Sequence, residues 1–291
     1  MVAKGKLLAD VQLGDMVFNT VDSLGVEWII TGIAGWWDLP DAEIPNEPLS
    51  KYEDGSYTED GRYRSLQLKM EGGYISPSIA VQPLARRALN EAVDSVRTPT
   101  TLRCNEYDGE KFRTVRYFGD MRVEPMFGTT TLFSFSLLAA DPRKYSWVEH
   151  SASVGVAAAS STGRTYNLTF PRVYPASSGG GGFVTLTNAG NAVTYPTITV
   201  TGPASDMRFT NTTTGEYLQV NMSLSAGDQL VVDMKEHRVT LNGSGNRNGA
   251  VSFGSTWWGL APGANSVVYT ASATTGPGST ALFRYRDAWI A

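Results

Sequence analysis

Apolar and polar residues alternate along several short runs in the first half of the chain. In LQLKMEG, residues 66–72, Leu66, Leu68 and Met70 are separated by polar residues, which is the pattern of a strand with one buried face. The runs VEWIITGI, FRTVRYF and TLFSFSLLAA are rich in β-branched and aromatic residues and predict three more strands. The first half is therefore expected to be built on a β-sheet or barrel.

One segment of the first half has the period of a helix instead. In SPSIAVQPLARRALNEAVDSVRTP, apolar residues recur at helical spacing as Val81, Leu84, Ala88, Ala92 and Val96. Pro83 is tolerated in a first turn, and Pro99 ends the run. The pattern predicts one amphipathic helix that packs on the sheet or barrel. Its outer face, which meets solvent or a neighbouring subunit, would hold Arg86, Arg87, Asn90, Glu91 and Asp94.

The second half has the pattern of an antiparallel β-sandwich throughout. Its short β-rich runs are VTLTN, TITVTG, MRFTNTTTG, EYLQV, DQLVVDM, RVTLNG, VVYTAS and ALFRYRDAWI. Asn-Gly, Gly-Asp and Pro-Gly turn signals separate them, at the spacing typical of sandwiches. His237 falls in a polar turn between two of these runs. The fold class predicted is mainly β, with no helix needed in the second half.

A change in composition divides the two halves. Residues 1–150 hold 16 of the 24 Lys and Arg and 22 of the 28 Asp and Glu, so charge is concentrated there. SASVGVAAASSTGR, residues 151–164, has only small residues until its final arginine, and small residues are typical of a linker or exposed arm. We therefore expect a first domain over 1–150, a linker or arm over 151–164 and a sandwich over 165–291.

Composition excludes several classes of function. A net charge of −4 without a basic stripe argues against nucleic-acid recognition. One cysteine and two histidines are too few for a Cys/His zinc site or an intramolecular disulfide. Phosphate-binding and dinucleotide-binding loops are absent from the sequence, so no cofactor is expected. The apolar run Leu7–Ala9 is too short for a signal peptide, and no run is long enough to insert in a membrane.

Catalytic chemistry has few candidates, and we predict no catalytic residue. His150 and His237 are the only histidines, and neither stands in a nucleophile motif. The acidic stretch DLPDAEIPNEPLSKYEDGSYTEDG, residues 38–61, offers oxygen ligands for calcium or a glycosidase carboxylate pair, but it lacks the order of an EF-hand loop. A surface loop that meets a partner or a neighbouring subunit explains it more simply. No metal site is predicted.

Two pairs of adjacent tryptophans raise the question of sugar binding. They are Trp36 with Trp37 and Trp257 with Trp258. Because neighbours in a strand point to opposite faces, one member of each pair is expected in the core and the other at the surface. Trp257 and Trp258 thus remain candidates for a sugar or partner contact, beside the alternative that they serve the core or a subunit contact.

The order of turns and strands in the whole chain resembles the distal tail (minor tail) protein family of long-tailed, non-contractile bacteriophages. In the second half the resemblance rests on TFPRVYP, SSGGGG, NAGNAVTYPTITV, TGP, NTTTGEYLQV, LSAGDQLVVDMKEHRVTLNG and WWGLAPGANSVVY, in that order. In the first half it rests on WIITGIAGWWDLP, YEDGSYTEDGRYRS and LLAADPRKYSW. Each motif alone is a generic turn signature, whereas their order and spacing are specific.

This resemblance implies a structural protein of the virion tail tip, made in the bacterial host cytoplasm. In such a protein the first domain assembles head to tail into a ring of six around the tail channel, and the second is a galectin-like sandwich. The expected partners are the protein itself, the tail tube protein, the tail-tip hub protein, and the tape-measure or receptor-binding proteins. The galectin sugar motif has no counterpart in this sequence, so sugar binding does not follow from the resemblance.

The residues at the subunit interface are predicted from opposite charges and from the first tryptophan pair. An acidic surface and a basic surface on one domain suit head-to-tail closure of a ring. The candidates are Trp36, Trp37, Asp38, Asp41 and Glu43 on one side and Arg113, Arg116 and Arg122 on the other. Two alternatives to a ring protein stay open, a carbohydrate-binding adhesin module of the virion and, with less support, a cell-wall glycosidase.

Overall fold

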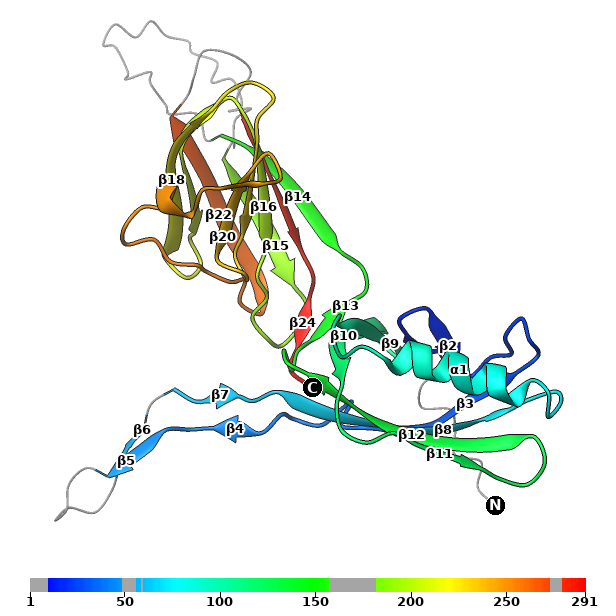
Figure 1. Cartoon of the computed structure of the whole chain (residues 1–291). Coiled ribbons are helices and arrows are strands. Elements are labelled where there is room, and N and C mark those ends of the chain that lie inside the picture. Colours follow the sequence, from blue (N-terminus) through cyan, green and yellow to red (C-terminus); the bar gives the residue numbers. More distant parts are fainter. Residues whose placement is uncertain (1–9, 49–55, 59, 157–181, 273–278) are drawn as a thin grey trace, which may run out of the picture. The chain divides into compact units, whose positions relative to one another are not determined.

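A computed structural model describes residues 10–48, 56–58, 60–156, 182–272 and 279–291. The chain forms two compact units (Figure 1). Unit 1 comprises Met1–Val148 and Trp289–Ala291, and unit 2 comprises Glu149–Ala288. The chain therefore leaves unit 1 once and returns to it for its last three residues.

Unit 1 is built on a strongly bent antiparallel sheet whose main path is β2-β1-β9-β10-β12-β8-β3. These strands are β1 (Val11–Leu13), β2 (Met16–Phe18), β3 (Glu27–Ala34), β8 (Leu66–Ile75), β9 (Thr100–Glu106), β10 (Gly109–Tyr117) and β12 (Thr130–Ala139). Two short strands join the path, β11 (Arg122–Pro125) beside β12 and β13 (Lys144–Ser146) beside β10. The amide of Trp28 donates to the carbonyl of Thr20 at 2.9 Å and links the two ends of the path, so the sheet approaches a barrel.

The period-two pattern of the sequence sets the faces of this sheet. Along β8 the apolar Leu66, Leu68 and Met70 are buried and the polar residues between them are exposed, as predicted. All ten residues of β8 pair with β12, from Leu66 opposite Ala139 to Ile75 opposite Thr130. The buried side chains of both strands meet the aromatic residues Trp28, Tyr74 and Phe133 in the core of unit 1.

The predicted helix is present as α1, Gln82–Val93, but its buried stripe differs from the prediction. The buried residues are Ala85, Leu89 and Val93, whereas Leu84 is half exposed. The helix is therefore turned by about one residue relative to the predicted face. The physical reason is side-chain size: Leu89 and Val93 bury more apolar surface than Ala88 and Ala92 would. The predicted outer face is exposed throughout.

Residues 38–63, which we call the arm, contain two pairs of strands in their described part, where the sequence predicted a loop. Its strands are β4 (Ala42–Glu43) paired with β7 (Arg62–Tyr63), and β5 (Asn46–Pro48) paired with β6 (Ser56–Thr58). Figure 1 shows the arm running outward beyond the unit 1 sheet, as a continuation of β3 and β8. The long hairpin that β3 and β8 begin is thus extended away from the core.

Unit 2 is an antiparallel sandwich of a six-stranded and a four-stranded sheet. The first holds β14 (His150–Gly155), β23 (Thr280–Tyr285), β16 (Thr197–Thr201), β19 (Gln229–Asp233), β20 (Arg238–Leu241) and β21 (Gly245–Asn246). The second holds β15 (Phe183–Asn188), β22 (Gly263–Ser272), β17 (Ala204–Asn211) and β18 (Glu216–Leu224). A 3-10 turn, η1, covers Asn248–Ala250, and β24 is Ala288–Trp289. The predicted sandwich and its runs are confirmed.

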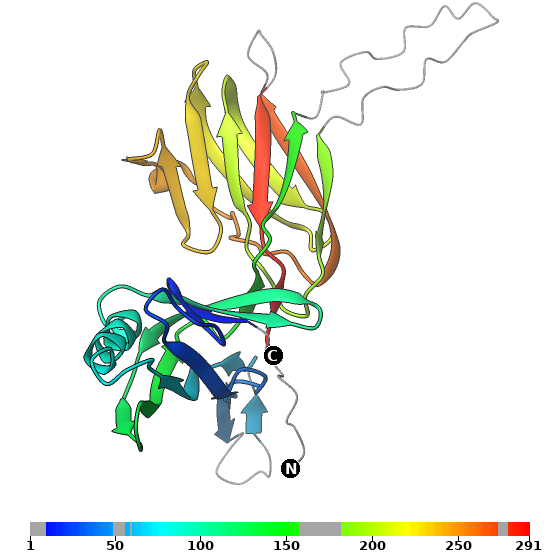
Figure 2. The same cartoon turned by 90° about the vertical axis from the view of Figure 1, so that its right-hand side faces the viewer.

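The predicted linker needs a correction at its start. Residues 150–155 form β14, which pairs with β23 along its whole length, from His150 opposite Tyr285 to Gly155 opposite Thr280. Figure 2 shows β14 in green beside β23 in red. Small residues suit this strand because it lies at the edge of the sheet, where only Val154 needs to fill the core. Residues 157–181, with the rest of the linker prediction, lie outside the described residues.

Buried asparagines explain the polar pattern of the second half. The side chain of Asn188 is buried, donates to the carbonyls of Ala192 and Leu260, and accepts from the amides of Gly190 and Ala288. Asn211 and Asn265 are also buried and close neighbouring turns in the same way. These residues satisfy main-chain groups at turns between strands, which is a structural role.

Candidate assembly surfaces

The tryptophan pair of unit 1 stands where β3 ends and the arm begins. Gly35 precedes it with φ +87°, a conformation that favours glycine. Trp36 is fully buried, whereas Trp37 is 44% exposed. Trp37 therefore remains available to a partner, and Trp36 is excluded from the interface that the sequence predicted for both.

The indole of Trp36 is part of a buried charged cluster that sequence patterns did not reveal. Its Nε1 donates to Glu106 Oε1 at 2.6 Å, and Lys144 Nζ donates to the same oxygen at 2.8 Å. The other oxygen of Glu106 accepts from Lys111 Nζ at 2.9 Å. Lys111 also reaches Asp108 Oδ2 at 2.7 Å and lies 4.3 Å from the ring centre of Trp289. The side chains of both lysines are almost completely buried.

Arg113 completes this cluster and cannot belong to an exposed basic strand. It is fully buried, its Nη1 donates to the carbonyl of Trp36 at 2.7 Å, and its Nε donates to the carbonyl of Pro142 at 3.1 Å. Its guanidinium lies 5.0 Å from the ring centre of Trp36. The period of the strand could have predicted the burial of Arg113, because every second residue of a strand lies on the same face. Lys111, Arg113 and Val115 share one face of β10, and all three are buried.

The titration of the cluster follows from burial and pairing. Burial alone would raise the pKa of Glu106, but hydrogen bonds from Lys144, Lys111 and Trp36 outweigh it, so its pKa is lowered. Burial likewise lowers the pKa of Lys144 despite Glu106. Burial lowers the pKa of Arg113 to about 10, which leaves it charged at neutral pH. Glu106 pairs with both buried lysines, and Arg113 is held by main-chain carbonyls, so the cluster is suited to holding structure.

The cluster fixes the place where the arm leaves the sheet. Trp36 is held through its indole by Glu106 and through its carbonyl by Arg113, only two residues before the arm begins at Asp38. Along the arm, Glu43 pairs with Arg62 at 3.0 Å and with Arg64 at 3.4 Å. Hydrogen bonds from these two arginines lower the pKa of Glu43. The base of the arm is thus held by charge pairs across its two strands.

Exposed side chains at the base of the arm form its candidate contact surface. Trp37, Leu39, Ile44 and Tyr63 are large apolar residues exposed to solvent, and they stand beside the exposed Asp38 and Asp41. Large apolar side chains exposed beside charged ones are typical of an interaction site. The sequence also predicted acidic residues within 47–59 for this surface, but their side chains lie outside the described part of the structure.

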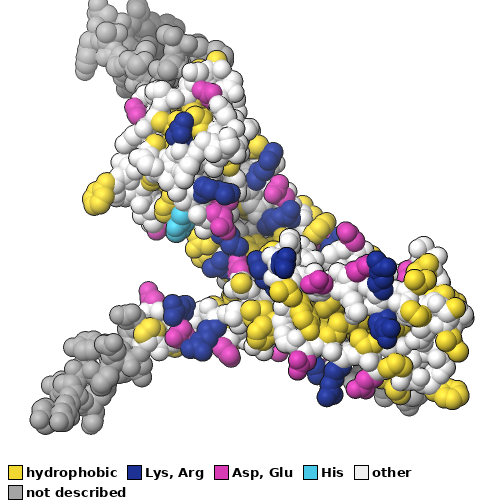
Figure 3. All heavy atoms as spheres, viewed as in Figure 1, with side chains coloured by type: hydrophobic (Ala, Val, Ile, Leu, Met, Phe, Trp, Pro, Cys, Tyr) yellow, Lys and Arg dark blue, Asp and Glu magenta, His cyan; other side chains and the backbone are white. Residues whose placement is uncertain are grey.

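The basic side of the predicted interface is reduced to two arginines. Arg116 is exposed on β10 and donates to the carbonyl of Val96 at 3.2 Å, and Arg122 is exposed on β11. Arg122 and Glu124 border a shallow hollow of about 470 Å³ on the outer face of the sheet, together with Lys69 and Glu71. In Figure 3 basic and acidic side chains are interspersed over the face shown, which offers no single-sign stripe for a nucleic acid.

The second tryptophan pair is poorly placed for sugar stacking. Trp258 is buried, and its Nε1 donates to the carbonyl of Phe209 at 3.1 Å. Trp257 is half-buried, and one face of its ring stacks on His237 with the ring centres 5.1 Å apart. The turn predicted for His237 is present, with φ +51°. Of the predicted pair, only Trp257 is partly exposed to a partner, and His237 covers one face of its ring.

The described residues contain no cluster of three or more His, Cys, Asp or Glu that could hold a metal ion. Among the same residues, no helix is both long and apolar enough to cross a membrane. Cys104 is buried, and burial raises the pKa of its thiol above the usual value, with the charge of Glu106 adding to the effect. This thiol is therefore inert at neutral pH.

The fold of the chain is similar to that of a solved phage protein. It is similar to the crystal structure of the Dit protein (gp 19.1) of phage SPP1, with a TM-score of 0.61 and 15% identity over 89% of this chain and 93% of that one. Two structures of the phage P2 baseplate in its activated conformation, with Ca and with Sr, give TM-scores of 0.47 and 0.46 at 8% and 10% identity. Each alignment covers 94% of this chain and 96% of the other.

Part of the second unit is similar in sequence to a known protein family. Residues 189–289 match the family described as the siphovirus-type tail component, C-terminal domain. No curated protein sequence matches the chain. The matched residues lie within unit 2, and this match together with the shared fold confirms the resemblance to distal tail proteins.

Proposed function

We propose that the protein is a structural component of the tail tip of a long-tailed bacteriophage, where it forms a ring of six copies between the tail tube and the hub. The observation that carries this proposal is the combination of a family match over residues 189–289 with one fold shared along 89% of the chain. The similar Dit protein is described as a hub adsorption apparatus of phages that infect Gram-positive bacteria. A structural role suits a chain whose buried lysines, Lys111 and Lys144, are paired with Glu106.

Ring formation is assigned to unit 1. The arm extends the β3–β8 hairpin away from the core, and its fixed base presents Trp37, Leu39, Asp38 and Asp41 to solvent. A projection that carries apolar and acidic side chains at its base suits insertion against a neighbouring copy. The matching surface would include Arg116 and Arg122, since opposite charges on two surfaces of one unit favour head-to-tail closure.

Unit 2 is assigned the contact with further tail proteins, including receptor-binding proteins. Buried asparagines close turns of this unit, and Trp258 lies in its core. The alternative of an adhesin that stacks sugar on tryptophan loses support, because Trp258 is buried and Trp257 is partly covered by His237. No observation favours a glycosidase.

The proposal is tested by the molar mass of charge-reversed variants in light scattering. The wild type is expected near six times the chain mass of 31.4 kDa. Asp38→Lys with Asp41→Lys should reduce it to the mass of a monomer, and so should Arg116→Glu with Arg122→Glu. A chain with all four changes has opposite charges on the two surfaces again, with their signs exchanged, and should form rings. Arg238→Glu, at an exposed position at the start of β20 in unit 2, is the control. Normal rings from both pairs of variants would overturn this interface.

A further inference from the structure

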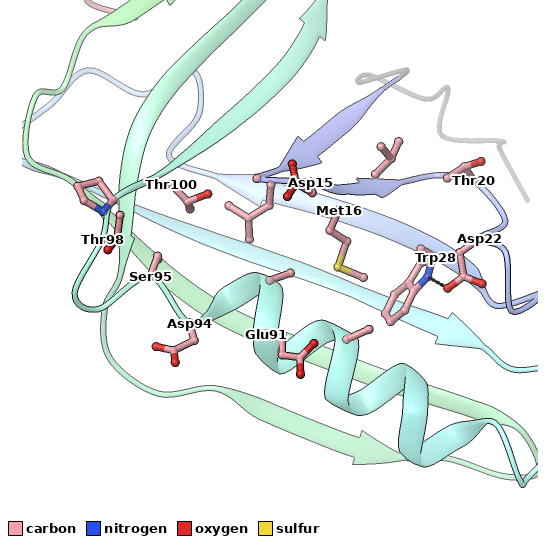
Figure 4. A pocket seen from close by; sticks show the side chains of 16 residues that line it. Asp15, Met16, Thr20, Asp22, Trp28, Glu91, Asp94, Ser95, Thr98 and Thr100 are labelled. Atoms are coloured by element: carbon pink, nitrogen blue, oxygen red, sulfur yellow. Dashed lines mark hydrogen bonds between the residues drawn. The ribbon is translucent and has the colours of Figure 1, made fainter.

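A groove runs between helix α1 and the β1–β2 hairpin of unit 1 (Figure 4). It has a volume of about 740 Å³, which is in the range of protein sites that hold ligands. Leu13, Met16 and Trp28 line it on the side of the sheet, and Ala88 and Ala92 line it on the helix. The groove therefore has an apolar floor, with a thioether and an indole opposite two small side chains.

The helix contributes an apolar stripe that the core of unit 1 does not use. Leu84, Ala88 and Ala92 follow one another at intervals of four residues, so they share one face of α1. The core buries the neighbouring stripe that ends at Val93, and it leaves Leu84 half exposed. Ala88 and Ala92 are half-buried and line the groove. An apolar stripe that lies outside the core suits contact with a further segment of chain.

The rim of the groove is acidic on both sides. Figure 4 shows Asp15 and Asp22 on the side of the sheet and Glu91 and Asp94 on the helix. None of the described residues that line the groove is a lysine, arginine or histidine. Carboxylates that face one another across a groove attract a cation placed between them. The charge of the occupant is therefore expected to be positive.

Two of the four acidic residues already have partners. Asp22 accepts from Trp28 Nε1 at 2.9 Å, which fixes the indole in the floor of the groove. Glu91 pairs with Arg87 at 2.7 Å. The other two acidic residues are exposed and stand on opposite sides of the groove, so they are the better placed to receive cations from an occupant.

The end of helix α1 adds to the negative potential on its side of the groove. The helix ends at Val93 with Asp94 as its C-cap, and its last turn has no basic residue. The C-terminal end of a helix carries partial negative charge from carbonyls without helical partners, so a cation is stabilising there. A positively charged side chain near Asp94 would meet both the carboxylate and this end of the helix.

The chemistry of the groove selects one kind of occupant. Phosphates of nucleic acids and of anionic lipids have the same sign as the rim and are repelled by it. In an extended peptide, successive side chains point to opposite sides, so apolar side chains can enter the groove while their neighbours stay at the rim. Lysine and arginine have long apolar stems, which lets their charges reach carboxylates beside an apolar floor.

We propose that this groove binds an extended basic segment of another protein, in which large apolar residues alternate with lysine or arginine. The apolar side chains contact Met16, Trp28 and the exposed stripe of α1. The cationic side chains pair with Asp15 and Asp94 and with the carbonyl end of the helix. The groove lies within unit 1 of a single chain, so this proposal does not depend on ring formation.

Binding of the labelled peptide KLKLKLK to the full-length protein, measured by fluorescence anisotropy, tests the position of the site. Ala92→Phe fills the groove and should lower the affinity by about tenfold or more, because the apolar side chains lose their floor. Asn90→Phe, which is exposed on the same helix outside the groove, is the control and should leave the affinity unchanged. No saturable binding, or an equal effect of both changes, would overturn the proposal.

The charges of the rim are tested with the same peptide. Asp15→Asn with Asp94→Asn should lower the affinity about two- to tenfold, and added salt should weaken binding to the wild type. Asp120→Asn with Glu124→Gln removes as much charge from exposed positions outside the groove and should have no effect. The peptides ELELELE and KSKSKSK should bind more weakly than KLKLKLK. Equal losses in the two double variants would exclude the rim as the cause of binding.

A second copy of the chain is the competing occupant, and the ring variant distinguishes the two. Binding of KLKLKLK is compared between the wild type and Asp38→Lys with Asp41→Lys, which is expected to be a monomer. Equal affinity supports a groove that is open to another protein, whether or not the wild type forms rings. Binding to the monomeric variant alone would show that a neighbouring copy covers the groove in the ring, and it would overturn the proposal.

Discussion

At the scale of single residues, Glu106 is the centre of the charged cluster in unit 1. Its two oxygens accept from Trp36, Lys144 and Lys111 at 2.6 to 2.9 Å, and both lysines are buried. Removing one charge from such a cluster leaves the others buried without compensation, which costs more than the pairs contribute when complete. The sequence could not reveal this cluster, because its members stand at positions 36, 106, 111, 113 and 144 and meet only in the folded sheet.

Glu106→Gln should therefore destabilise the protein by about 3–5 kcal/mol, because it leaves two buried ammonium groups near a neutral amide. The free energy of unfolding in urea measures this loss. Glu27→Gln, at an exposed position at the start of β3, is the matched control and should stay close to the wild type. Equal stability of the two variants would show that the cluster contributes nothing.

The same residue predicts a dependence on pH. The pKa of Glu106 is lowered in the folded protein from an ordinary value of 4.5, so the folded state holds the ionised form more strongly than the unfolded state does. Its stabilisation is present above about pH 4.5 and is lost as the pH falls through the folded pKa. The wild type should lose stability more steeply than Glu106→Gln below pH 4.5. Parallel curves for the two proteins would contradict this origin.

Gly190 allows a test of close packing in unit 2. A Cβ at this position would lie 1.8 Å from the carbonyl oxygen of Ala288, a distance that no real contact reaches. Gly190→Ala should cost about 1–3 kcal/mol or more, because strand β24 or the turn must move. Gly249→Ala, where a Cβ meets nothing within 4 Å, is the control. Thermal unfolding of the two variants measures the difference, and similar melting temperatures would contradict the clash.

At the scale of elements, the strands were predictable and the helix face was not. Runs such as residues 66–72 alternate strictly, so one register buries all their apolar residues. In α1 two neighbouring stripes are both apolar, and burial of the larger Leu89 and Val93 decides between them. Strand β14 was missed because its small residues resemble a linker and only its pairing with β23 defines it.

The helix stripe predicts a contrast between two leucines. Leu89→Ala should cost about 2–5 kcal/mol because Leu89 is fully buried. Leu84→Ala should cost less than about 1 kcal/mol, because half of that side chain is exposed. Denaturant unfolding of both variants checks the order. A larger loss for Leu84→Ala would restore the face predicted from the sequence.

At the scale of the whole molecule, composition and the order of motifs predicted two mainly β parts. Which strands pair with one another could be found only from the structure. The arm is an example. Its eight acidic residues suggested a loop, but main-chain pairing between β4 and β7 and between β5 and β6 makes it a ribbon. Of the residues predicted for the interface, Trp36 and Arg113 are buried, and Trp37, Asp38, Asp41, Arg116 and Arg122 stay exposed.

The central claim is that copies of this chain close into a ring, and electron microscopy of the purified protein tests it most directly. The account predicts negatively stained particles with a central hole and six repeated subunits, whose number agrees with a mass of about six times 31.4 kDa. Replacing residues 42–62 by a short turn should remove the rings and leave folded monomers. Particles that remain single copies at high protein concentration, with no rings in any image, would contradict the claim.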